Sequence, residues 1–193
     1  MSKKKYPLRI PRYACGIRMQ EPRGKTNKIW WAERWHKTIE AMRTDGARLG
    51  KGRMYAMGGQ ISKICIDRSH VECVVVGSRP EPYTVSIDFR VPDAAQKKRI
   101  IKKLKDEPIT VARLVAGDLP FEVEEAFRQE GLDFFPGGRI APGKYDMTTK
   151  CSCPDYANPC KHVIAALFIL GEEVSRRPQF LLELRGIDIE ELF

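Results

Sequence analysis

Three cysteines and one histidine lie within twelve residues near the end of the 193-residue chain, as Cys151-Ser-Cys153 and Cys160-Lys-His162. If residues 150–153 are extended, Cys151 and Cys153 point to one face, because side chains in a strand repeat every two residues. Three thiolates and one imidazole are typical of tetrahedral zinc, and four protein ligands leave no open position for water or substrate. The sequence therefore predicts a structural zinc site.

A redox role is the competing interpretation of the same cysteines. The pairs Cys-x-Cys and Cys-x-His lack the Cys-x-x-Cys spacing of dithiol oxidoreductases. The chain also shows no nucleophile paired with a base, no pair of carboxylates and no open metal site. We therefore expect a protein that is not an enzyme and has no small-molecule substrate.

A turn and a helix must position these ligands. Residues 154–159, Pro-Asp-Tyr-Ala-Asn-Pro, are typical of a turn that carries the chain from Cys153 to Cys160. The apolar run after Cys160 predicts a helix, with Asn158 as N-cap, Pro159 as first residue and His162 in the first turn. A strand, a turn and a helix start would together form a zinc knuckle.

This pattern of Cys-x-Cys, short spacer, Cys-x-His and apolar helix resembles the SWIM zinc finger. All four ligand positions of that family match, at Cys151, Cys153, Cys160 and His162. The chain is also similar, more loosely, to stand-alone prokaryotic SWIM proteins in a Trp-rich helix at 30–42 and in residues 46–55. The resemblance implies a zinc cofactor and association with a Swi/Snf-type ATPase.

Positive charge is concentrated at the N-terminal end of the chain. The formal net charge is +9, yet residues 1–60 hold 15 Lys and Arg against 4 Asp and Glu, while residues 61–193 hold 19 against 21. Such asymmetry favours nucleic acid as partner, because phosphate neutralisation releases counterions. A solubilising tail together with a solvated helix face is the alternative.

The candidate nucleic-acid contacts lie mainly in a glycine-rich segment. Residues 47–59 alternate basic residues with glycines, which let a backbone approach a phosphate closely. The alternative is a glycine-rich turn that opens a sheet, and the segment is no Walker loop. We expect nucleic acid, DNA rather than RNA, to contact five basic residues. They are Arg43 at the end of the segment 29–43, Arg48, Lys51 and Arg53 in the glycine-rich segment, and Lys161 between two metal ligands.

The remaining pattern predicts an α+β fold. Residues 29–43 have helical periodicity, with Trp31 and Trp35 on one apolar stripe and Asp45-Gly46 as the stop. Trp30 and Trp35 can stack on bases, although aromatic residues at this spacing more often face a core. Residues 60–67, 71–77 and 83–91 predict a small antiparallel sheet with one wet face and the other packed on the Trp-rich helix.

The middle of the chain predicts helices at 93–106, 110–115 and 121–129, and a short helix at 180–184 follows the knuckle helix. The first carries six basic residues between 97 and 105, which are a second candidate contact for nucleic acid or a solvated surface. We divide the chain into a basic arm (1–28), an N-terminal α+β lobe (29–92), a helical segment (93–144) and a SWIM-type zinc finger with C-terminal helices (145–193).

No secretory signal is evident, and the longest apolar run, residues 163–170, is too short to span a bilayer. Cys15, Cys65 and Cys73 lack the spacing of a disulfide framework, so we expect the reducing cytoplasm, without membrane attachment. Two functions follow as hypotheses. One is a zinc-binding, non-enzymatic nucleic-acid-binding protein that serves as accessory module of a DNA-processing machine. The alternative, implied by the resemblance, is an adaptor that docks on a Swi/Snf-type helicase or ATPase without nucleic-acid contact.

Overall fold

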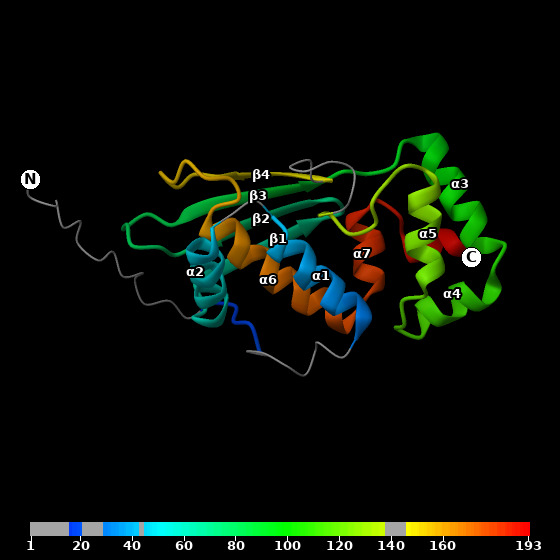
Figure 1. Ribbon diagram of the computed structural model, residues 1–193, viewed down its shortest axis with the longest axis horizontal. Helices are drawn as coiled ribbons and strands as arrows, with labels where there is room; N and C mark the ends of the chain where they lie inside the picture. The colour runs from blue at the N-terminus through cyan, green and yellow to red at the C-terminus, as the bar shows by residue number, and fades with distance from the viewer. Residues whose placement is uncertain (1–15, 21–28, 43–44, 138–145) are drawn as a thin grey trace, which may run out of the picture.

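Alternating apolar side chains build a four-stranded antiparallel sheet in the order β1-β2-β3-β4 (Figure 1). The computed structural model describes residues 16–20, 29–42, 45–137 and 146–193. In β3, Val85 and Ile87 are buried while Thr84 and Asp88 face outward, as the period of two requires. The strands are β1 (Ile61–Asp67), β2 (His70–Val75), β3 (Tyr83–Phe89) and β4 (Met147–Cys151).

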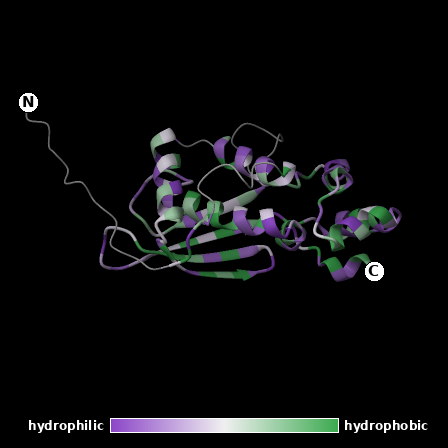
Figure 2. Cartoon of the chain, turned by 90° about the horizontal axis from the view of Figure 1, so that it is seen from below, coloured by the Kyte–Doolittle hydropathy of each residue, from purple (hydrophilic) through white to green (hydrophobic). Residues whose placement is uncertain are grey.

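Helices α1 (Trp30–Glu40), α2 (Gly46–Met57) and α6 (Lys161–Arg176) cover one face of this sheet. Figure 2, seen from below, shows the sheet and these helices as two layers. Twelve of the 16 residues of α6 are buried, because α6 packs on β3 and β4 and also packs against α1 and α2. The predicted packing of the Trp-rich helix on the sheet is therefore made largely through α6.

The Trp-rich helix lies where its apolar stripe predicts. Trp31, Trp35, Ile39 and Met42 are all buried. The Trp35 indole N–H donates to the carbonyl of Leu167 in α6 at 2.9 Å, which satisfies its polar atom inside the core. The core interpretation of these aromatics therefore holds, rather than base stacking by Trp35.

Two local predictions for residues 45–59 are wrong. Asp45-Gly46 does not stop α1, which ends at Glu40; instead Asp45 is the N-cap of α2, and its side chain accepts from the Arg48 N–H at 2.7 Å. The segment 47–59 is neither a phosphate-binding loop nor a glycine-rich turn, since most of it forms α2. Close packing on α6 at Gly52 offsets the low helix propensity of glycine.

Helices α3 (Ala94–Lys105), α4 (Pro108–Val115) and α5 (Phe121–Gln129) form a separate group at one end of the molecule (Figure 1). They match the predicted helices, and Gly117 and Gly131 end α4 and α5 with positive φ angles. Helix α7 (Gln179–Leu184) packs on α6, and a 3₁₀ helix, η2 (Ile189–Leu192), packs on α3. The buried side chains of Phe180, Leu181 and Leu184 belong to the core.

Strand β4 brings the C-terminal part of the chain into the same sheet as the N-terminal part. It pairs with β3 in the register Val85↔Cys151 to Phe89↔Met147. The domain boundaries at 28, 92 and 144 stay predictions, while the sheet and α6 join residues 29–92 and 145–193 into one core. Within the described part of the chain, no helix is long and apolar enough to cross a membrane.

Candidate metal centre

The four predicted ligands come together between the end of β4 and the start of α6. Cys151 is the last residue of β4, Cys160 is the N-cap of α6 and His162 lies in its first turn. The Ser152 N–H donates to the Thr84 carbonyl at 3.0 Å, which keeps the chain beside β3 beyond the end of the strand. One ligand atom from each of the four residues lies within 4.8 Å of every other.

The distances fit tetrahedral zinc. His162 Nδ1 lies 3.7 Å from Cys151 Sγ and 3.8 Å from Cys160 Sγ. Zinc bonds of about 2.3 Å to sulfur and about 2.0 Å to nitrogen at tetrahedral angles place such atoms roughly 3.6 Å apart. The residues present therefore fit a zinc ion held by three thiolates and one imidazole, with His162 Nδ1 facing the ion.

The loop between the two ligand pairs is fixed by its own polar groups. We call residues 154–159 the knuckle loop. Asn158 Nδ2 donates to the Thr149 carbonyl at 2.8 Å, and Thr149 Oγ1 donates to Asn158 Oδ1 at 2.5 Å. The prediction that Asn158 caps the helix and Pro159 begins it is thus wrong, because Asn158 is bonded to β4 and Cys160 takes the cap. The Asn158-Pro159 peptide bond is cis.

The thiols differ in acidity. A hydrogen bond from Cys151, and then one from His162, lower the pKa of the Cys160 thiol well below its ordinary value. The pKa of Cys151 is raised, because its thiol donates to Cys160 and is partly buried. Burial also raises the pKa of Cys153. The cluster therefore carries one favoured thiolate, and a cation must displace the remaining thiol protons to bind all three sulfurs.

Two tyrosines enclose the histidine. The Tyr83 ring centroid lies 4.6 Å and the Tyr55 ring centroid 5.2 Å from that of His162. Burial raises the pKa of Tyr55 to about 12, so its hydroxyl stays protonated at neutral pH. His162 Nε2 is buried without a hydrogen-bond partner among the described residues. The histidine side of the site is therefore shielded from water, while the ligands Cys151 and Cys153 are only half-buried.

The predicted nucleic-acid residues have different environments. Arg48 binds Asp155 through two hydrogen bonds of 3.0 and 3.1 Å and also pairs with Asp45. The hydrogen bond to Asp155 is the main cause that raises the pKa of Arg48. Arg48 thus ties α2 to the knuckle loop. Arg43 lies outside the described residues.

The other three candidates lie on α2 and α6. The Arg53 guanidinium lies 4.9 Å from the centroid of the Phe168 ring, and it is 3.8 Å from the Glu40 carboxylate. Lys161 Nζ lies 5.3 Å from the centroid of the Tyr55 ring. Lys51 is exposed on α2. Neither lysine has a carboxylate within ion-pair distance in the described part of the chain.

Sequence reasoning did not assign four residues that shape this site. Asp155 and Tyr156 lie between the ligand pairs, where their position alone could have drawn attention to them. Tyr55 and Tyr83 come from distant elements and carry no local signal. His70, which lies between Cys65 and Cys73 in the sequence, has its Nδ1 atom 2.6 Å from Asp88 Oδ1.

Comparison with known proteins identifies the segment that contains the metal cluster. The family model described as SWIM zinc finger matches residues 144–171. An uncharacterized protein of Mycobacterium tuberculosis is 34% identical over 177 residues, which make up 92% of this chain and 62% of that protein. The chain thus spans less than two thirds of the length of this relative. No solved structure matches the chain.

Proposed function

Since residues 144–171 match the SWIM zinc finger and their Cys/His cluster fits zinc, we propose that the chain is a non-enzymatic nucleic-acid-binding protein. In this role it would be an accessory module of a DNA-processing machine. Zinc fixes the knuckle loop and the start of α6, and the neighbouring cations contact nucleic-acid phosphates. The absence of catalysis is part of the proposal, supported by four protein donors that fill a tetrahedral shell.

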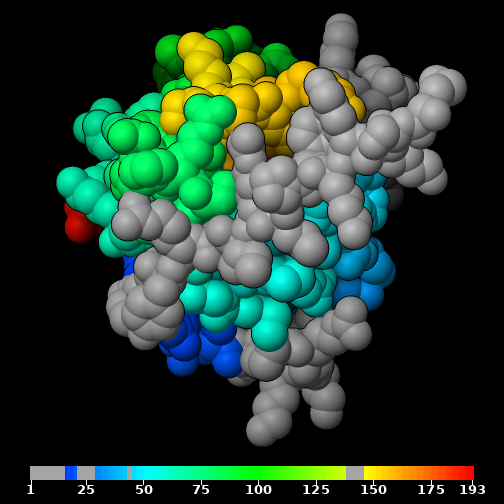
Figure 3. Space-filling model, turned by 90° about the vertical axis from the view of Figure 1, so that its left-hand side faces the viewer, coloured from blue at the N-terminus to red at the C-terminus, as the bar shows by residue number. Residues whose placement is uncertain are grey.

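One observation carries the proposal. Helix α2 and the knuckle loop are joined by the ion pair of Arg48 with Asp155. Both elements belong to the end of the molecule that faces the viewer in Figure 3. Lys51 follows Arg48 by three residues and therefore lies on the same side of α2. We call Arg48, Lys51, Tyr156 and Lys161 the knuckle face. The three cations Arg48, Lys51 and Lys161 outnumber the two carboxylates that pair with Arg48, Asp45 and Asp155, so this surface carries a small excess of positive charge.

Fluorescence anisotropy with labelled DNA tests this proposal. The double variant Lys51→Glu/Lys161→Glu should bind at least tenfold more weakly at low salt, because phosphate contacts dominate such affinity. The plot of log association constant against log salt concentration should also become less steep, by roughly 1.5 in slope. The matched control is Lys63→Glu/Lys98→Glu, which makes the same charge change at two exposed lysines of β1 and α3.

The proposal fails if the wild-type protein binds neither duplex nor single-stranded DNA at 50 mM salt. The surface assignment fails if the control variant loses as much affinity as the double variant of the knuckle face. In that case the basic helix α3, which carries the exposed lysines 98, 102, 103 and 105, becomes the better contact.

A specific observation also favours the adaptor as second candidate. Helix α2 presents Ala47, Gly50, Met54 and Met57 at the spacing of one apolar stripe, and Met54 is 70% exposed. Such a stripe suits a protein helix better than a phosphate backbone. We expect the variant Met54→Glu to abolish co-purification with a Swi/Snf-type ATPase from nuclease-treated lysate, while Lys51→Glu preserves it. An association that disappears on nuclease treatment would contradict the adaptor.

A further inference from the structure

Tyr156 is exposed in a part of the molecule that is otherwise firmly held. It lies in the knuckle loop between Cys153 and Cys160, and it is 93% exposed. The other tyrosines near the metal centre, Tyr55 and Tyr83, are 5% and 6% exposed. A single exposed aromatic ring is common on protein surfaces, so a role for Tyr156 must follow from what holds it and what lies beside it.

The loop residues before and after Tyr156 are held in place by hydrogen bonds. Before it, Asp155 accepts from the Ala157 N–H at 3.1 Å and from the side chain of Arg48. After it, Asn158 is bonded to Thr149 of β4 through two hydrogen bonds. The metal ligands Cys153 and Cys160 flank the loop. A ring on such a loop loses little conformational entropy when it binds a planar ligand.

A cation lies beside the ring. The Arg48 guanidinium carbon is 5.2 Å from the centroid of Tyr156, and Asp155 fixes its position by two hydrogen bonds. Arg48 comes from α2, 108 positions before Tyr156, so this pair exists only in the folded protein. Planar guanidinium and aromatic groups are the side chains on which unpaired bases stack.

We propose that Tyr156 and Arg48 form a stacking site for an unpaired base of single-stranded nucleic acid, with Lys51 and Lys161 at the adjacent phosphates. This inference rests on the proposed nucleic-acid function and adds a preference for single strands. In a duplex the base faces are stacked on each other and are not available to the ring. The site selects no base, since each base offers a flat face.

Anisotropy with the whole 193-residue chain, loaded with zinc, tests the proposal. The probes are a labelled 12-nucleotide oligothymidine, an abasic strand of the same length and a duplex of the same length. The variant Tyr156→Ala should bind oligothymidine about tenfold more weakly and bind the abasic strand and the duplex as the wild type does. Tyr156→Trp should retain the affinity for oligothymidine, and Phe121→Ala is the control for another exposed aromatic residue.

Stacking itself has a direct signal. A 2-aminopurine base in the single strand should lose fluorescence on binding to the wild type and recover most of it with Tyr156→Ala. Native mass spectrometry of each variant must show unchanged zinc content, so that a loss of folding is not read as a loss of stacking.

The outcomes separate this inference from the proposed function. If the wild type binds no nucleic acid, both are overturned. If the wild type binds, and Tyr156→Ala weakens binding to the duplex and to the single strand equally or weakens neither, the stacking site is overturned and the proposed function stands. If Tyr156→Ala abolishes binding to a protein partner and leaves oligothymidine binding unchanged, Tyr156 is a protein contact and the stacking site is again overturned.

Discussion

Single residues at the metal centre each meet two demands at once. Cys160 is the N-cap of α6 and a predicted zinc ligand, so its backbone begins the helix while its sulfur faces the metal site. His162 directs Nδ1 toward the thiols while Tyr55 and Tyr83 pack against its ring. Because each ligand is also part of the packing, loss of the metal should disturb the structure and not only the site.

The variant Cys160→Ser should lose zinc. Structural zinc contributes about 10–16 kcal/mol in zinc-finger peptides, comparable to the total stability of a domain, about 5–15 kcal/mol. Native mass spectrometry should show about one zinc ion per wild-type chain and none in the variant, with a lower melting temperature. Cys65→Ser, which changes an exposed cysteine of β1, should keep both the zinc and the melting temperature. A wild-type protein that folds equally well without metal would refute the structural role.

His36 should give the fold a pH dependence near neutrality. Burial, and then the charge of Arg53, lower the pKa of His36 below the ordinary value of 6.5. The unfolded chain therefore takes up this proton first as the pH falls, so stability decreases from above pH 6.5 down to the lower pKa of the folded state. We expect urea midpoints of the wild type to fall between pH 7.5 and 5.5 relative to those of His36→Gln. If the urea midpoints of the wild type and of His36→Gln changed in parallel with pH, the pH dependence would not come from His36.

At the scale of elements, the contact between α2 and α6 places the knuckle face. Gly52 lies so close to α6 that a Cβ built on it would be 2.4 Å from Ile164 Cγ2 and 3.0 Å from the Lys161 carbonyl. The same helix has Gly50 on its outer side, where a Cβ would meet nothing within 4 Å. Two glycines of one helix thus have opposite roles, which the sequence alone cannot distinguish.

These two glycines make a matched pair of variants. Gly52→Ala should destabilise the protein by about 1–3 kcal/mol, because the overpacked helices must separate. Gly50→Ala should stabilise it by up to about 1 kcal/mol, since alanine is the better helix former and fits without contact. Urea denaturation measures both values. Stabilisation by Gly52→Ala would show that α2 does not pack on α6 this closely.

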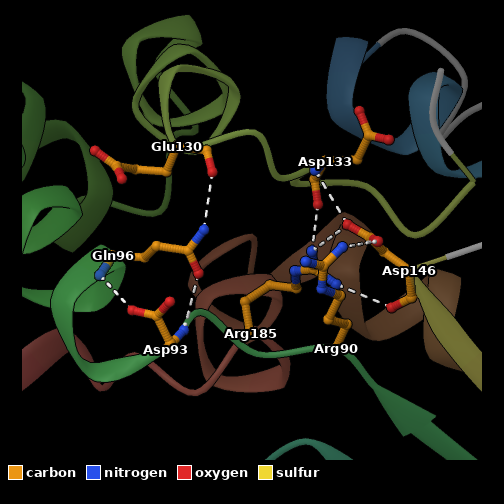
Figure 4. A network of polar contacts seen from close by, with 7 residues as sticks. All are labelled: Arg90, Asp93, Gln96, Glu130, Asp133, Asp146 and Arg185. Atoms are coloured by element: carbon orange, nitrogen blue, oxygen red, sulfur yellow. Dashed lines mark hydrogen bonds and ion pairs between the residues drawn. The ribbon is translucent and has the colours of Figure 1, made fainter. Parts of the chain in front are cut away.

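At the scale of the whole molecule, a buried arginine links the sheet to the helical group. Arg185 follows α7 and is fully buried; its guanidinium donates to the Asp146 carboxylate at 2.9 Å and to the Asp133 carbonyl (Figure 4). Asp146 precedes β4, and Arg90 follows β3 and pairs with the same carboxylate at 3.4 Å. In the same view, Gln96 of α3 donates to the Glu130 carbonyl at 2.9 Å.

Arg185→Met should destabilise the protein by about 3–5 kcal/mol, because the carboxylate of Asp146 is then left buried without its main counter-charge. The double variant Arg185→Met/Asp146→Asn should recover part of this loss, since the uncompensated charge is gone. Chemical denaturation of the wild type, both single variants and the double variant gives the coupling energy. Additive losses in the double variant would show that the two groups do not act as a pair.

The sequence by itself determined the chemistry of the metal centre and most of the elements. Three thiols and one imidazole at this spacing can do little other than bind a soft, tetrahedral cation, and periods of two and 3.6 residues are local properties. The strands at 61–67, 70–75 and 83–89 and the helices of the middle segment follow from that pattern.

Only the tertiary structure decided what surrounds the metal centre. Residues 47–59 look like a loop because glycine has low helix propensity, but the Asp45 cap and the contact of Gly52 with α6 make most of them a helix. Arg48 finds its partner Asp155 at a distance of 107 residues along the chain, and this pairing makes a residue predicted to contact phosphate also a tie between α2 and the knuckle loop. Such choices depend on which distant surfaces bury each other, and no local pattern encodes that.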